Sequence, residues 1–187
     1  MSHYFELSEI KQKLITVSAL ALSGEEFSKR YYMGVNDIQK VYTLSEYTKL
    51  TKLIVSNSLI EVSVKMRCLV DDLKQKNILI EDGDKIKIYN SGRCADGNFK
   101  EKGFRFICNK IIHAESFNLD YIGKTTYHAD MVWWSGEITL SGKYDGKNWE
   151  FFFSVIHWLD QVMNFINRTE KEITRLQGDS RDLQNHS

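Results

Sequence analysis

Hydrophobic residues recur with a helical period over three long stretches of the chain. The first covers residues 6–30, the second 37–78 and the third 155–176. Spacings of three and four residues place such side chains on one stripe, which predicts amphipathic helices. In the second stretch, poor helix formers around Asn57 favour a kink or break. The apolar positions of the three stretches are Leu7, Ile10, Leu14, Val17, Ala21 and Leu22; Leu44, Tyr47, Leu50, Leu53, Ile54, Ile60, Val64, Met66, Leu69, Val70 and Leu73; and Val155, Trp158, Leu159, Val162, Met163 and Ile166.

Between the second and third helices the pattern changes to alternation with period two. Residues 78–89 alternate on either side of an acidic, glycine-containing turn and predict a hairpin, and the glycines of 90–103 predict a loop. A short helix is expected over 104–115. From 117 to 154 the signal is β, and Asp145-Gly146 predicts the turn of an antiparallel hairpin over 137–153, because both residues tolerate positive φ.

These elements predict a mainly α (α+β) fold. We expect a bundle of about four helices with a β-hairpin or small meander inserted before the last one. Residues 1–177 form a single domain in this interpretation, with the β insertion around 117–153. The polar residues 178–187 are expected to form a flexible tail.

Composition narrows the class of protein. The 187 residues are 42% hydrophobic and 27% charged, as in globular domains, and 25 basic residues balance 25 acidic ones. Zero net charge argues against non-specific nucleic-acid binding as the main function and leaves a local basic site open. The three cysteines include no CxxC pair, and no signal-peptide pattern or bilayer-length apolar run is present. We therefore expect a cytoplasmic protein with no membrane association.

No known cofactor or metal motif is present. The sequence lacks zinc-finger spacing, HExxH, a Walker loop and GxGxxG. We expect no cofactor and no metal.

The short helix carries the residues most suggestive of chemistry. Arg105, Asn109 and His113 follow one another at i, i+4 and i+8, which makes a polar stripe. Arg supplies a permanent charge, Asn an oriented amide, and His a group that moves protons near neutral pH. In a purely structural interpretation, His113 caps the C-terminal end of the helix and the Arg105 side chain is exposed to solvent. Beside the stripe we expect a buried face made of Phe104, Ile107, Cys108 and Ile111.

The string from Arg105 to Asn109-Lys110-Ile111-Ile112-His113 resembles the motif of the HEPN superfamily. This resemblance implies a small helical bundle, often dimeric, that acts as a metal-independent ribonuclease in bacterial toxin–antitoxin or phage-defence systems, or binds RNA without cleaving it. It also implies roles: His113 as general acid or base, Arg105 stabilising the phosphorane charge, and Asn109 orienting the scissile group. Seven residues separate Arg105 from His113, about 12 Å along a helix, so one phosphate would reach both only across a dimer.

A second polar cluster lies on the long second helix. Arg67 and Asp71 stand at i, i+4 and either form a surface ion pair or project beside the short helix, where Arg67 joins Asn109 and His113. The turn around them is expected to be largely buried.

Two functions remain open from the sequence. The first is an RNA-binding homodimer that cleaves RNA in its catalytic form. The second is a catalytically silent helical protein that binds a protein partner through the aromatic hairpin, which contains Trp149, Phe151, Phe152 and Phe153.

Overall fold

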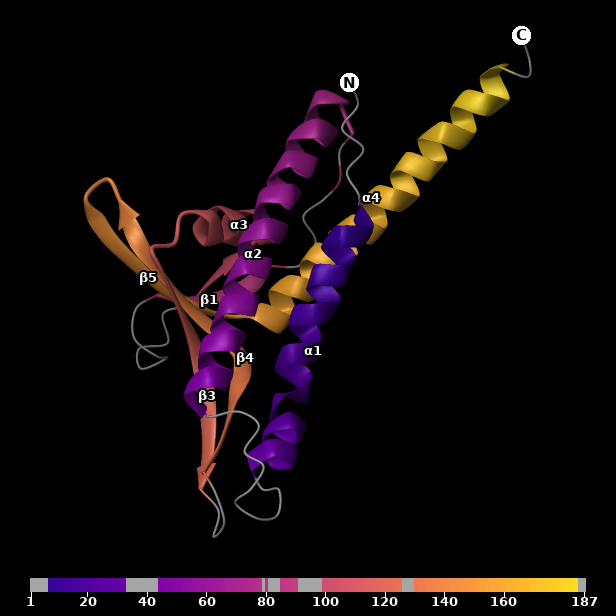
Figure 1. The fold of residues 1–187 in the computed structure, drawn as a ribbon. Coiled ribbons are helices and arrows are strands. Elements are labelled where there is room, and N and C mark those ends of the chain that lie inside the picture. Colours follow the sequence, from indigo (N-terminus) through magenta and orange to yellow (C-terminus); the bar gives the residue numbers. More distant parts are fainter. Residues whose placement is uncertain are drawn as a thin grey trace.

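Five antiparallel strands form one sheet, and helices α1, α2 and α3 lie on one side of it (Figure 1). The computed structural model describes residues 7–32, 44–78, 80, 85–90, 99–125 and 130–184. Its elements in chain order are α1 (Leu7–Tyr32), α2 (Leu44–Gln75), β1 (Ile86–Asn90), β2 (Phe99–Lys102), α3 (Phe104–Ile112), β3 (Ser116–Thr125), β4 (Asp130–Tyr144), β5 (Lys147–Ser154) and α4 (Val155–Gln184). The strand order is β2-β1-β5-β4-β3.

The expected four-helix bundle with a small β insertion is wrong. The fold is α+β, and the helices pack against a five-stranded sheet as well as against one another. The expected hairpin over 78–89 is also wrong, because β1 pairs with β2 and β5 instead. β2 lies inside the stretch expected to be a loop. A four-residue strand shows too little alternation to be recognised, and its pairing partner is set by the tertiary fold.

The long hairpin of β4 and β5 is confirmed. Tyr144 pairs with Lys147, and the two turn residues Asp145 and Gly146 have φ of 50° and 70°. One face of the sheet is apolar because partners in register share a face. Phe117, Leu140 and Phe151 align across three strands, as do Ile88, Phe153 and Ile138. All six side chains are buried.

α1 and α2 lie side by side against this apolar face (Figure 1). α1 buries Ile10, Leu14 and Val17, and ion pairs connect it to both of the other long helices. Lys13 pairs with Glu61 of α2 at 3.1 Å, Lys65 of α2 pairs with Glu9, and Lys11 pairs with Glu170 of α4 at 2.6 Å.

α2 is continuous through Asn57, so the expected break is wrong. Val55, Ser58 and Leu59 are buried around this turn, and their packing outweighs the weak local helix propensity. The turn around Arg67 is largely buried, as expected, through Met66, Leu69 and Val70, but Cys68 is exposed. Residues 37–43, also expected in this helix, lie outside the described residues.

α4 runs to Gln184, past the expected end at 176 and through most of the segment expected to be a tail. Figure 1 shows its C-terminal half extending away from the sheet. Among the described residues, no helix has the length and apolar character needed to span a bilayer.

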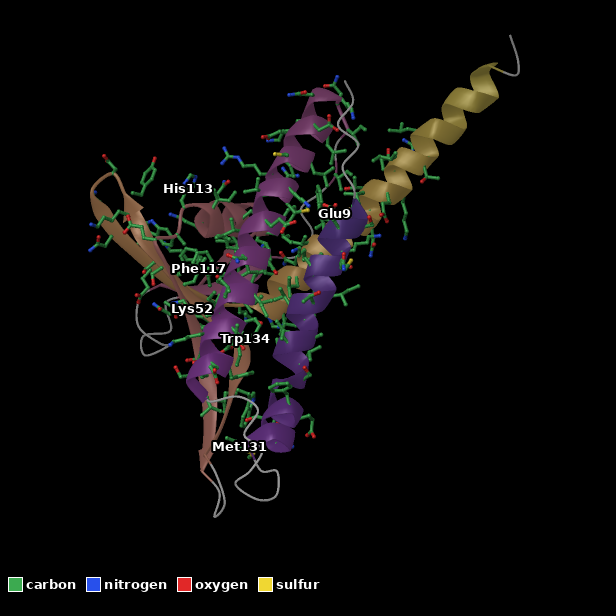
Figure 2. All side chains as sticks on the ribbon, viewed as in Figure 1. Glu9, Lys52, His113, Phe117, Met131 and Trp134 are labelled. Atoms are coloured by element: carbon green, nitrogen blue, oxygen red, sulfur yellow. The ribbon has the colours of Figure 1, made fainter. Side chains whose placement is uncertain are left out.

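A bulge in β4 brings α1 and α4 close to the sheet. Between the pairs Leu119–Ile138 and Tyr121–Trp134, β4 contains two more residues than β3. The buried Trp134 (labelled in Figure 2) donates its indole N–H to the Glu137 carbonyl at 2.7 Å. Gly136 lies in the bulge with φ of 83°. A Cβ there would lie 3.2 Å from Cγ1 of Ile156 and 3.4 Å from Cβ of Ala21.

We expect Gly136→Ala to lower the free energy of unfolding by about 1–3 kcal/mol, because alanine meets both the positive φ and the close contacts. Urea denaturation measures the change. Gly123→Ala is the matched control, since its Cβ would meet atoms only at 3.9 Å. Equal stability of the two variants would contradict this account of the bulge.

A half-buried tyrosine connects the sheet to α2. The hydroxyl of Tyr121 on β3 donates to the Thr48 carbonyl at 3.0 Å, and burial raises the pKa of Tyr121 to about 12 from its ordinary value of 10.0. Between these pH values the unfolded chain binds fewer protons than the folded one. The free energy of unfolding therefore falls as pH rises from about 10 to about 12.

We expect Tyr121→Phe to abolish this contribution. The stability difference between the original chain and the variant, measured by urea denaturation from about pH 9 to about pH 11.5, should shrink as pH rises. A difference that stays constant over this range would show that Tyr121 ionises as it does in the unfolded chain.

Candidate functional site

α3 connects β2 to β3 and packs against α2 and α4. Its expected buried face is confirmed, since Phe104, Ile107, Cys108 and Ile111 are all buried. The Phe104 ring lies 4.8 Å from the Phe165 ring of α4, between ring centroids. The opposite side of α3 stays accessible, and it carries the polar residues singled out in the sequence.

A cavity of about 210 Å³ lies between α2 and α3. Its polar lining contains three cationic side chains, one carboxylate and one amide: Arg67, Lys74, Arg105, Asp71 and Asn109. Its apolar lining consists of Met66, Val70, Phe104 and Cys108. Such a small, cationic hollow with oriented donors suits an anionic group of the size of a phosphate.

Arg105 is held in place by contacts on several sides. Its Nη2 donates to the Ile80 carbonyl at 3.3 Å. Its guanidinium carbon lies 5.6 Å from the Phe165 ring centroid and 5.9 Å from that of Phe104. These contacts fix the charged group at the cavity, which lowers the entropy lost when it binds an anion.

The structure separates His113 from this cavity. His113 is the C-cap of α3, its backbone N–H bonds to the Asn109 carbonyl at 3.2 Å, and its side chain is exposed. Figure 2 shows it where α3 leads into β3. Arg105 and Asn109 line the cavity as the stripe predicts, and Arg67 and Asp71 join them from α2, but His113 does not. The three residues of the polar stripe therefore do not line one cavity within one chain.

The other flank of α3 carries lysines over aromatic rings. Lys110 Nζ lies 4.3 Å from the Trp149 ring centroid and 5.9 Å from those of Phe106 and Tyr144. Lys102 Nζ lies 5.1 Å from the Phe106 centroid. We call this set the aromatic flank. Cation–π contacts of this kind hold the ammonium groups at the surface beside the rings.

Gly142 on β4 permits this arrangement. A Cβ at this position would lie 2.6 Å from the Trp149 ring and 3.0 Å from the His113 carbonyl oxygen. Only the missing side chain lets Trp149 and the end of α3 approach the strand so closely. Trp149 in turn stacks on Phe151, with ring centroids 5.4 Å apart.

Sequence reasoning missed Lys74, Lys102 and the contacts between lysines and rings in the aromatic flank, of whose rings it singled out only Trp149, in the aromatic hairpin. The spacing of Phe106 and Lys110, at i and i+4, indicates one of these contacts. The approach of Trp149 leaves no local signal, because it comes from a strand distant in the chain.

Metal ligation has no support in the part of the chain that the structure describes, where no group of three His, Cys, Asp or Glu side chains converges. No family model, curated protein or solved structure matches this chain.

Proposed function

We propose that this chain binds single-stranded RNA along α3, with phosphate in the cavity and bases on the aromatic flank. The observation that carries the proposal is the position of α3 between these two surfaces. A cationic hollow borders one side of the helix, and lysine-covered rings border the other.

The cavity supplies the charge that the RNA backbone requires. Three cations face one carboxylate there, so the hollow is locally positive in a chain with zero net charge. Guanidinium groups bind phosphate oxygens through paired donors, and each neutralised phosphate releases counterions. Local rather than global charge accounts for an RNA site on a neutral protein.

The aromatic flank supplies stacking surface. Tyr144 is 76% exposed at the end of the β4–β5 hairpin, and Trp149 is partly exposed. Bases of a single strand stack on such rings regardless of sequence, whereas the bases of a duplex are already stacked. This difference favours a single strand as the ligand.

The exposed ridge of α3 joins the two surfaces. At 100° per residue, Asn109 and His113 point between Arg105 on one side and Lys110 on the other. Both are exposed and offer donors to a strand that crosses the helix. The resemblance of this string to the HEPN motif also supports RNA as the ligand.

Binding without cleavage is the form of this function that the geometry supports within one chain. Cleavage would need His113 and Arg105 at one phosphate, and only Arg105 lines the cavity. The alternative of a protein partner bound by the aromatic hairpin has less surface to use, because Phe151 and Phe153 are buried in the core.

We expect Lys74→Gln with Lys110→Gln to weaken binding of a labelled single-stranded RNA of about 12 nucleotides. Fluorescence anisotropy at several salt concentrations measures this. Loss of the Lys74 phosphate contact should reduce the slope of log affinity against log salt by about 0.7, and loss of the Lys110 charge beside the strand should reduce it further. Lys52→Gln with Lys171→Gln, which changes the charge equally on exposed lysines away from α3, is the control (Lys52 is labelled in Figure 2). Equal losses in the two double variants, or no RNA binding by the original chain, would contradict the proposal.

A second experiment separates binding from cleavage. We expect labelled RNA to stay intact with the original chain and with His113→Ala, because His113 does not reach the cavity. The melting temperature should change little, since an exposed side chain contributes little to stability. RNA degradation that His113→Ala abolishes would show catalysis and overturn binding without cleavage.

A further inference from the structure

The outer face of α2 is aliphatic. Five side chains on this helix are 38–56% exposed, where a surface helix normally presents charged or polar residues. At 100° per residue all five lie within about 60° of the direction of Asn57, which is also exposed. We call these six residues the α2 stripe: Leu50, Leu53, Ile54, Asn57, Ile60 and Val64.

Apart from Leu53, whose position becomes that of Glu61, the α2 stripe matches itself when it is reversed about Asn57. In an antiparallel pair of α2 helices with a two-fold axis at Asn57, Leu50 lies opposite Val64 of the second copy. Ile54, which adjoins Leu53, then lies opposite Ile60 of the second copy, and Asn57 meets its own equivalent. A two-fold interface requires such self-complementarity. The Asn57 amide carries both donors and an acceptor, so two copies satisfy each other across the axis.

The charges at the ends of the stripe agree with this arrangement. Antiparallel pairing brings Glu46 and Lys49 of one copy near Arg67 and Asp71 of the other. Each end of the interface then contains two acidic and two basic side chains, whose charges balance. Parallel pairing would instead place Glu46 beside Glu46 and Arg67 beside Arg67. Like charges would then repel at both ends.

We propose that a second copy of this chain docks on the α2 stripe and forms an antiparallel homodimer about Asn57. This inference does not depend on RNA binding, because its contacts lie on the stripe rather than on α3. An apolar hollow of about 280 Å³ between α1 and α2 adjoins the stripe and is lined by Phe27, Leu50 and Ile54 among others. It extends the apolar surface available to the second copy.

The expected affinity follows from the size of the contact. From residue 50 to residue 64 the stripe is about 21 Å long, so the interface is at the small end of specific interfaces. We therefore expect a dissociation constant in the micromolar range. A dimer of this kind forms reversibly as the protein concentration changes.

Sedimentation velocity from about 1 to about 200 µM protein tests the proposal. Leu53→Glu and Ile60→Glu, which place a carboxylate at the centre, should each raise the dissociation constant about tenfold or more. Leu22→Glu is the matched control, because Leu22 is an exposed leucine of α1 outside the stripe. Thermal melting by circular dichroism identifies any variant that fails to fold.

Oxidative cross-linking tests the direction of pairing in a Cys94→Ser background. Asn57→Cys should form a disulfide-linked dimer, since the two copies meet at this residue. Without Asn57→Cys the chain should not cross-link, because antiparallel pairing places the two exposed Cys68 residues about 33 Å apart. A monomer at all concentrations, cross-linking through Cys68, or an equal effect of Leu22→Glu would each overturn the proposal.

Discussion

The apolar face of the sheet must be covered, and this requirement determines where the helices lie. The central strands β5 and β4 place Phe151, Phe153, Ile138 and Leu140 on that face, and each is almost fully buried. A large apolar side chain contributes about 1.5–3 kcal/mol when fully buried, so exposing these four would cost about as much as a domain's whole stability margin. α1 and α2 lie across it as a pair, tied to each other and to α4 by ion pairs. The Tyr121–Thr48 hydrogen bond fixes α2 to β3.

The site depends on this arrangement of layers. A helix of nine residues such as α3 is too short to be stable alone, so its packing against α2 and α4 holds it. That packing uses one face and leaves the polar ridge accessible. The cavity also depends on the continuity of α2 through Asn57. The uninterrupted helix places Arg67, Asp71 and Lys74 beside Arg105 of α3. A kink at Asn57 would move these side chains away from α3, and the cavity would lose this part of its lining.

Charge is distributed by the same packing. Although the net charge is zero, charged residues are arranged differently in two regions of the molecule. Between α1, α2 and α4, acids and bases pair across the helix contacts, as Lys13 does with Glu61. Around α3, cations outnumber acids in the cavity, and lysines cover the rings of the aromatic flank. A neutral composition therefore excludes a global field and says little about any one surface.

By itself the sequence determined the elements whose signals are local. The three long helices, the hairpin turn at Asp145-Gly146 and the buried face of α3 follow from periodicity and turn chemistry within short windows. Only the tertiary structure decided how these elements meet. β1 pairs with β2 and β5, and His113 lies away from the cavity that Arg105 lines. Trp149, on a strand distant in the sequence, packs against Lys110. The apolar period of α2 likewise combined two faces, of which the sheet covers one. The physical reason is the same in each case: periodicity shows which residues share a face, but the packing of distant segments decides what that face meets.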